Sequence, residues 1–97
     1  MKTREEIVEA LRQAWPQLAR DFGVRRIALF GSYARGDQRE DSDVDVLVEV
    51  DPSIGLRFVD LADQIEALLG VRTDVISRRA IPLSHWALIE KELVDVS

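Results

Sequence analysis

The sequence contains no cysteine among its 97 residues. Disulfides and thiolate metal sites are therefore excluded. No apolar run approaches the roughly 20 residues that a membrane-spanning helix needs. The first ten residues, MKTREEIVEA, also lack the apolar segment of a secretory signal. These absences predict a soluble cytoplasmic protein without membrane association.

Positive charge is in short supply as well. Lysine and arginine number 13 against 18 aspartates and glutamates, a net charge of −5. Direct nucleic-acid binding is not expected, because it needs a basic surface. Apolar residues make up 46% of the chain and charged residues 32%, which is ordinary for a globular protein. The length predicts a single domain, residues 1–97, with no room for a second lobe.

Three stretches have helical patterns. The first begins at Thr3 and Glu6, which fit a capping box, carries an apolar stripe and ends at Gly23. Pro16 lies inside it and predicts a kink or restart near Trp15. The second ends at Gly70, and the third runs from residue 84 to 93. The apolar stripes are, in order, Ile7, Leu11, Leu18 and Phe22; Phe58, Leu61, Ile65 and Leu68; and Trp86, Ile89 and Leu93.

Three stretches read as strands, at residues 27–30, 43–50 and 71–76, while residues 94–97 are ambiguous. The even positions of the second strand are four valines suited to burial, and its odd positions begin with two aspartates. The order helix, strand, strand, helix, strand, helix predicts an α+β fold. We expect a small mixed sheet of three to four strands with helices packed on one face.

The stretch from Ile27 to Val50, IALFGSYARGDQREDSDVDVLVEV, concentrates the chemistry. Asp43 and Asp45 are one residue apart in a strand, so their side chains project to the same side. Two carboxylates about 4 Å apart repel by roughly 4 kcal/mol at an effective dielectric near 20, and a divalent cation with oxygen ligands would offset this. The turn at Gly31 and Ser32 supplies N–H groups and a hydroxyl suited to phosphate. The pattern favours metal-assisted chemistry on a nucleoside triphosphate.

Asp74 adds a third acid in a later strand, where it is costly unless it is paired or bound to a cation. Arg35 and Arg39 are candidates for triphosphate neutralisation. Each residue also has a simpler interpretation. The aspartates can be turn or surface acids, Asp74 can pair with an arginine, and the arginines can be solvated loop charges. Glu49 shares the aspartate face, but a salt bridge at the rim explains it better than metal binding.

Together, Gly31-Ser32, ten intervening residues, Asp43-x-Asp45 and the later TDVI resemble the DNA polymerase β-like nucleotidyltransferase superfamily. The GSxARG and SDxDxxV pieces are similar to the minimal nucleotidyltransferase (MNT) domain in particular, and the resemblance covers nearly the whole chain. It implies that Asp43, Asp45 and Asp74 are catalytic and hold two Mg²⁺ ions. It also implies that Gly31, Ser32, Arg35 and Arg39 bind the phosphates of ATP.

The resemblance further implies a partner. MNT proteins of prokaryotes typically pair with a small HEPN-domain RNase toxin, in a hetero-oligomer in which they act as the antitoxin. The leading hypothesis is an Mg²⁺-dependent transfer of AMP from ATP to a tyrosine of that toxin. The alternative is a non-catalytic antitoxin that neutralises the toxin by binding alone. Transfer to a small molecule such as an aminoglycoside is disfavoured, because the chain has no acceptor-binding lobe.

Overall fold

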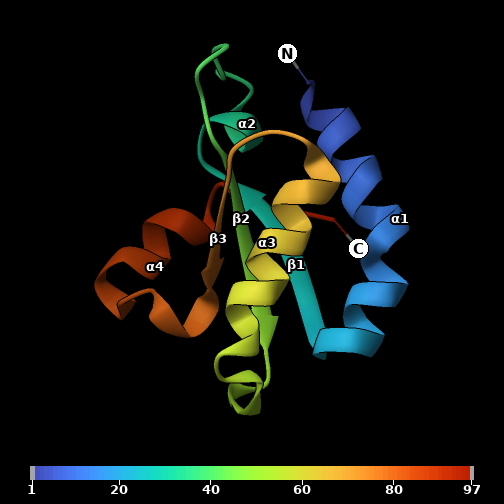
Figure 1. Ribbon diagram of the computed structural model, residues 1–97. Helices are drawn as coiled ribbons and strands as arrows, with labels where there is room; N and C mark the ends of the chain where they lie inside the picture. Colours follow the sequence, from blue (N-terminus) through green and yellow to red (C-terminus); the bar gives the residue numbers. More distant parts are fainter. Residues whose placement is uncertain (1, 97) are drawn as a thin grey trace.

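A four-stranded mixed sheet with the strand order β3-β2-β1-β4 forms the centre of the computed structural model, which describes residues 2–96 (Figure 1). β1 pairs antiparallel with both β2 and β4, and β2 pairs parallel with β3. The predicted α+β class with a small mixed sheet is confirmed. The strands are β1 (Val24–Phe30), β2 (Val44–Val50), β3 (Thr73–Ser77) and β4 (Val94–Asp95), and the α-helices are α1 (Arg4–Phe22), α2 (Gly31–Arg35), α3 (Arg57–Leu69) and α4 (Leu83–Glu90).

Helix α1 begins and ends as its sequence predicts. The Thr3 hydroxyl accepts a hydrogen bond from the Glu6 N–H, and the Glu6 carboxylate accepts one from the Thr3 N–H. Gly23 ends the helix in the left-handed conformation, with φ at 69°. The predicted restart near Trp15 is wrong, because the helix continues without interruption through Pro16. Packing of the apolar stripe against the sheet stabilises the helix more than one missing backbone bond weakens it.

The main core lies on one face of the sheet, beneath α1 and α3. The even-numbered valines of β2 from 44 to 50 are buried there, as their alternation predicts. From α3, the buried residues are Leu61, Ile65 and Leu69, whereas Leu68, predicted to belong to the stripe, is 42% exposed. At 100° per residue, both i+3 and i+4 from Ile65 are near the stripe, and here the i+4 position faces the core.

Helix α4 covers the opposite face of the sheet, so the expectation that all helices pack on one face is wrong (Figure 1). Trp86, Ile89 and Leu93, the predicted stripe, pack against a second and smaller cluster formed by Ala28, Leu47 and Ile81. Three consecutive apolar residues of β1, Ile27 to Leu29, are fully buried because this strand has helices on both sides.

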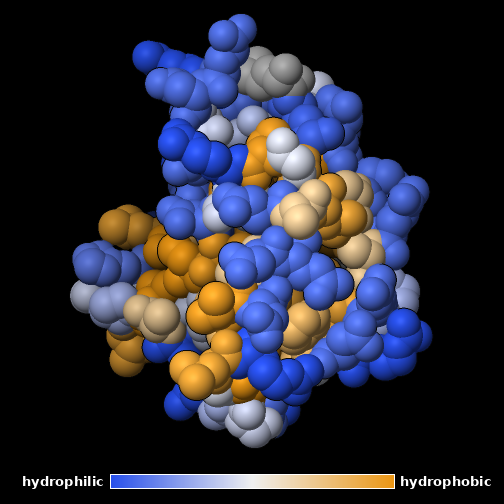
Figure 2. Space-filling model, in the orientation of Figure 1, coloured by the Kyte–Doolittle hydropathy of each residue, from blue (hydrophilic) through white to orange (hydrophobic). Residues whose placement is uncertain are grey.

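Apolar side chains are also exposed at the surface. They include Leu56 and Val59 around the start of α3, and Leu83 and Leu88 on α4. Figure 2 shows apolar residues gathered beside α4 and at the lower end of α3, and hydrophilic ones over the end that carries α2. None of the helices within residues 2–96 combines the length and apolar character needed to cross a membrane.

Candidate active site

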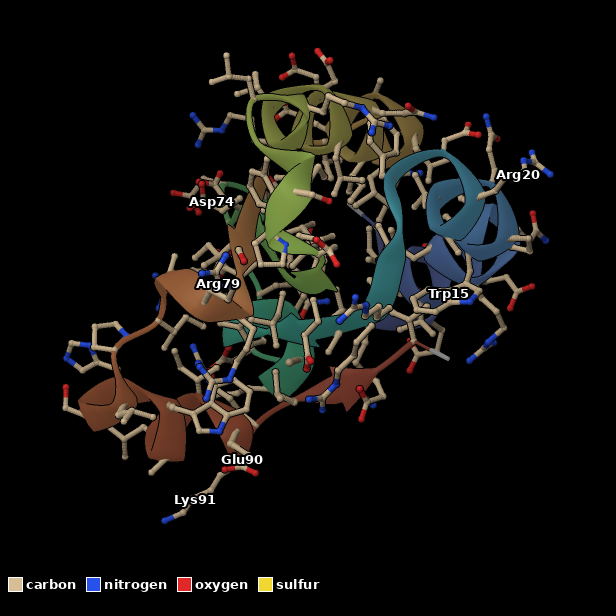
Figure 3. The ribbon with its side chains drawn as sticks, turned by 90° about the horizontal axis from the view of Figure 1, so that it is seen from below. Trp15, Arg20, Asp74, Arg79, Glu90 and Lys91 are labelled. Atoms are coloured by element: carbon tan, nitrogen blue, oxygen red, sulfur yellow. The ribbon has the colours of Figure 1, made fainter. Side chains whose placement is uncertain are left out.

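The strand register brings several of the predicted site residues together at one end of the sheet. Asp45 of β2 lies opposite Phe30 of β1 on one side and Asp74 of β3 on the other. Gly31 and Ser32 follow Phe30 directly. The register therefore places the Gly-Ser turn, Asp45 and Asp74 in one row across three neighbouring strands. Asp74 lies on the edge strand, on the side of the molecule away from Trp15 and α1 (Figure 3).

The turn after β1 is more ordered than the sequence predicts. Residues 31–35, expected to be a turn and the start of a loop, form the single-turn helix α2. Gly31 has a φ of 74°, which favours glycine. A Cβ at this position would overlap the Oδ2 atom of Asp45 and lie 3.1 Å from its Cγ. The backbone of Gly31 therefore lies so close to the Asp45 carboxylate that only glycine fits at position 31.

Asp45 is half-buried and surrounded by negative charge. Burial raises the pKa of its carboxyl group above the ordinary value, and the neighbouring carboxylates of Asp74 and Asp43 raise this pKa further. Arg35 acts in the opposite direction, and Glu92 adds to the rise. The three predicted acids therefore interact electrostatically, and their ionised forms destabilise one another unless a cation neutralises them.

Asp43 precedes β2 and is held next to the start of β3. Its Oδ1 atom lies 3.1 Å from Nε of Arg72. The alignment is not that of a hydrogen bond, so this buried oxygen has no hydrogen-bonding partner among the described residues. Arg72 therefore offsets part of the charge, although sequence reasoning did not assign it to the site. The only signal for it was its place two residues before Asp74.

Asp74 itself is exposed. The expectation that its charge is costly unless it is paired or bound to a cation is therefore wrong. As an edge-strand residue it keeps its contact with water, so its charge carries little desolvation cost. The strand register pairs Asp74 with Asp45, as the predicted site requires. Glu49 makes a salt bridge of 3.0 Å to Arg26, in agreement with the rim role expected for it.

The two candidate phosphate-binding arginines differ in their surroundings. Arg35 donates to Asp37 at 3.2 Å and to the Oε2 atom of Glu92 at 3.2 Å, so its guanidinium is already paired. Arg39 is exposed, and its side chain makes no hydrogen bond or ion pair with residues 2–96. Arg35 is close enough to Asp45 to lower the pKa of its carboxyl group. Arg39 has no such effect on Asp45.

A family model for the nucleotidyltransferase domain matches residues 4–96. The chain belongs to this nucleotidyltransferase family. The resemblance expected from Gly31-Ser32 and Asp43-x-Asp45 is thereby confirmed at the level of the family.

Among curated relatives of this nucleotidyltransferase, the protein adenylyltransferase MntA of Thermococcus cleftensis is 42% identical over 98 residues, which cover 99% of this chain and 98% of that protein. Among solved structures, a protein assigned as a minimal nucleotidyltransferase superposes with a TM-score of 0.80 at 35% identity, covering 96% of this chain and 95% of that one.

More distant structures share the fold alone. One is a toxin–antitoxin with AMP-PNP, with a TM-score of 0.67 at 23% identity, covering 89% of this chain and 72% of that one. Another is a tri-AMPylated Shewanella oneidensis HEPN toxin in complex with MNT antitoxin, with a TM-score of 0.55 at 19% identity, covering 97% of this chain and 68% of that one.

The aspartates of this nucleotidyltransferase match the ligand chemistry of the Mg²⁺ that its family implies. All three supply oxygen donors, the kind that Mg²⁺ prefers. One oxygen of Asp43 has no aligned partner, and the pKa of Asp45 is raised by its neighbours, so both would gain from a cation. As they stand, no three carboxylate or imidazole groups within residues 2–96 are close enough together to hold a metal ion. Within residues 2–96, neither Asp43 nor Asp74 makes a side-chain hydrogen bond, although Asp43 forms an ion pair with Arg72.

Proposed function

We propose that this nucleotidyltransferase is an Mg²⁺-dependent protein adenylyltransferase. It transfers AMP from ATP to a tyrosine of a HEPN-domain RNase toxin and so acts as the antitoxin. The observation that carries the proposal is the row formed by the Gly31–Ser32 turn, Asp45 and Asp74, in which Asp45 pairs with Phe30 and with Asp74. Support for a protein acceptor comes from the 42%-identical relative, which is named a protein adenylyltransferase.

The partner is proposed from two observations. The fold is shared with an MNT antitoxin in complex with a HEPN toxin that carries AMP groups. The surface also exposes large apolar side chains, with Leu56 91% and Leu83 82% exposed, of the kind that protein interfaces bury. A hetero-oligomer would cover such side chains and bring the acceptor tyrosine to the site.

In the proposed reaction, the tyrosine oxygen attacks the α-phosphorus of ATP, and the bond from that phosphorus to the bridging oxygen breaks as pyrophosphate leaves. Asp43, Asp45 and Asp74 would hold up to two Mg²⁺ ions, which neutralise phosphate charge and favour ionisation of the acceptor. Asp74, the most exposed of the three, takes the proton of the tyrosine hydroxyl. The Gly31 N–H and the Ser32 hydroxyl bind the β- and γ-phosphates, and Arg35 neutralises their charge.

The test is to incubate the protein with its HEPN partner, ATP and Mg²⁺, and to measure the mass of the partner. We expect increments of AMP on a tyrosine. The double variant Asp43→Asn, Asp45→Asn should abolish them, because it removes two of the three carboxylates. Asp63→Asn, which changes an exposed acid on α3, should leave them unchanged. If the double variant still neutralises the RNase and the wild type adds no AMP, the non-catalytic antitoxin is the correct function.

A further inference from the structure

Glu92 reaches from the far end of the chain into the Gly31–Ser32 turn. Its Oε1 atom accepts a hydrogen bond of 3.0 Å from the Gly31 N–H. Both of its carboxylate oxygens also accept from Nη1 of Arg35, at 3.4 Å and 3.2 Å. A carboxylate therefore occupies the two donors to which the proposed function assigns phosphate oxygens.

Electrostatics makes this a costly place for a fourth acid. Glu92 is close enough to contribute to the raised pKa of Asp45, together with Asp74 and Asp43. Only 28% of its side chain is exposed, so water screens the repulsion incompletely. The Gly31 N–H and the guanidinium of Arg35 are the groups that offset it. Carboxylates and phosphates accept hydrogen bonds from such donors in the same way, so a bound phosphate would need the same partners.

The backbone around Glu92 is anchored on both sides. The Glu92 N–H donates to the carbonyl of Ile89 at the end of α4. Two residues later, β4 pairs with β1 through Leu29↔Val94 and Ala28↔Asp95. Release of the carboxylate therefore needs only rotation of the side chain, and the sheet and α4 can stay in place.

We propose that Glu92 is an internal substitute for phosphate, which holds Gly31 and Arg35 in the absence of nucleotide and is displaced by the triphosphate of the nucleotide. This inference rests on the proposed function, since it concerns the same phosphate-binding groups. It identifies Glu92 as a residue that sets nucleotide affinity. A ligand must provide enough phosphate oxygens, with their cation, to replace the carboxylate, so ATP is favoured over AMP.

The first test is the affinity for AMP-PNP with Mg²⁺, measured by isothermal titration calorimetry. Glu92→Gln keeps the shape of the side chain and removes its charge, and we expect it to bind roughly 3- to 10-fold tighter, because charged hydrogen bonds are stronger than neutral ones. Glu90→Gln is the matched control. Glu90 is exposed at the end of α4, where it points away from the sheet (Figure 3), and its substitution should change affinity less than twofold. Equal or weaker binding by Glu92→Gln would overturn the proposal.

The second measurement separates displacement from a general charge effect. The Gly31 amide resonance in an ¹⁵N–¹H NMR spectrum should differ between wild type and Glu92→Gln in the absence of ligand, and should reach one common position when both are saturated with AMP-PNP and Mg²⁺. Persistent different positions at saturation would mean that Glu92 stays in place, against the proposal. AMP transfer by the wild type, with unchanged affinity in Glu92→Gln, would overturn this inference alone. No binding of AMP-PNP by either protein would overturn the proposed function as well.

Discussion

Asp45 illustrates how a functional side chain costs stability. Its pKa is raised in the folded protein, so the folded state holds this proton more tightly than the unfolded state does. Ionised Asp45 therefore opposes folding. This effect is fully present above the raised folded pKa, and it disappears as the pH falls below the unfolded value of about 3.9.

We expect Asp45→Asn to increase the free energy of unfolding at pH 7 in the absence of divalent cations. The gain should be a few tenths of a kcal/mol to about 1 kcal/mol, after discounting for the solvent that reaches this half-buried group. This gain should vanish at pH 3, where the Asp45 carboxyl group of the wild type is neutral, as is the amide that replaces it in the variant. Urea unfolding at the two pH values measures it, and the exposed Asp63→Asn is the control. A loss of stability at pH 7 would contradict this explanation of the pKa.

Gly31 and Gly36 offer a matched pair of glycine positions. Both have a left-handed φ, at 74° and 81°, but only Gly31 would bring a Cβ into Asp45, whereas Gly36 has open space around it. We expect Gly36→Ala to cost about 1–2 kcal/mol of stability, the price of the conformation alone. Gly31→Ala should cost about 3 kcal/mol or more, because the turn or the carboxylate must also move.

Activity distinguishes the two glycine variants further. Gly36→Ala should retain AMP transfer at a temperature well below its melting point, and Gly31→Ala should lose it. Thermal unfolding followed by circular dichroism, together with the transfer assay, measures both effects. Equal losses of stability would show that the close approach of Gly31 to Asp45 is not needed.

At the scale of elements, α1 contains a proline that its helix tolerates. Pro16 is exposed and lies in the interior of the 19-residue helix. We expect Pro16→Ala to stabilise the protein by about 1–3 kcal/mol, because it restores a backbone hydrogen bond and removes a steric clash. Gln17→Ala, at the next exposed position, should change stability by less than about 0.5 kcal/mol. Urea unfolding measures both, and a destabilised Pro16→Ala would mean that the proline shapes the packing of α1.

The sequence predicted those elements whose signals are local. The capping box at Thr3, the alternating valines of β2 and the glycines after α1 and α3 each specify their structure through neighbouring residues. Residues 31–35 were missed as a helix, because a single turn has too few residues for a period. The face on which α4 packs was also missed, since β1 contributes buried apolar residues to both clusters and its sequence does not show which helix covers which face.

The same distinction applies to the site. The spacing of Asp43 and Asp45 predicted that both lie in one strand, whereas β2 begins at Val44 and Asp43 precedes it. Their proximity to Asp74 depended on pairing between β2 and β3, which the resemblance implied and the register now shows. Arg72 and Glu92 escaped notice, because their contacts bridge distant parts of the chain and no sequence motif marks them.

For the molecule as a whole, acids outnumber bases and part of the excess gathers at one end of the sheet. Any ligand that binds the folded state alone stabilises it, by about 1.4 kcal/mol at ten times its dissociation constant. We expect Mg²⁺ to raise the melting temperature of the wild type at constant ionic strength. The increase should be lost in the double variant Asp43→Asn, Asp45→Asn. Differential scanning calorimetry measures it, and an equal increase in both proteins would place the cation elsewhere.

Strand β2 serves two purposes on its two faces. Its even positions fill the space beneath α1 and α3, while Asp45 projects to the opposite side. A substitution on one face of β2 therefore need not disturb the other face. The residues for stability and the residue for chemistry can change independently along one strand. A single substitution such as Asp45→Asn could therefore remove the carboxylate and leave a folded domain, which under the proposed function would still bind the toxin.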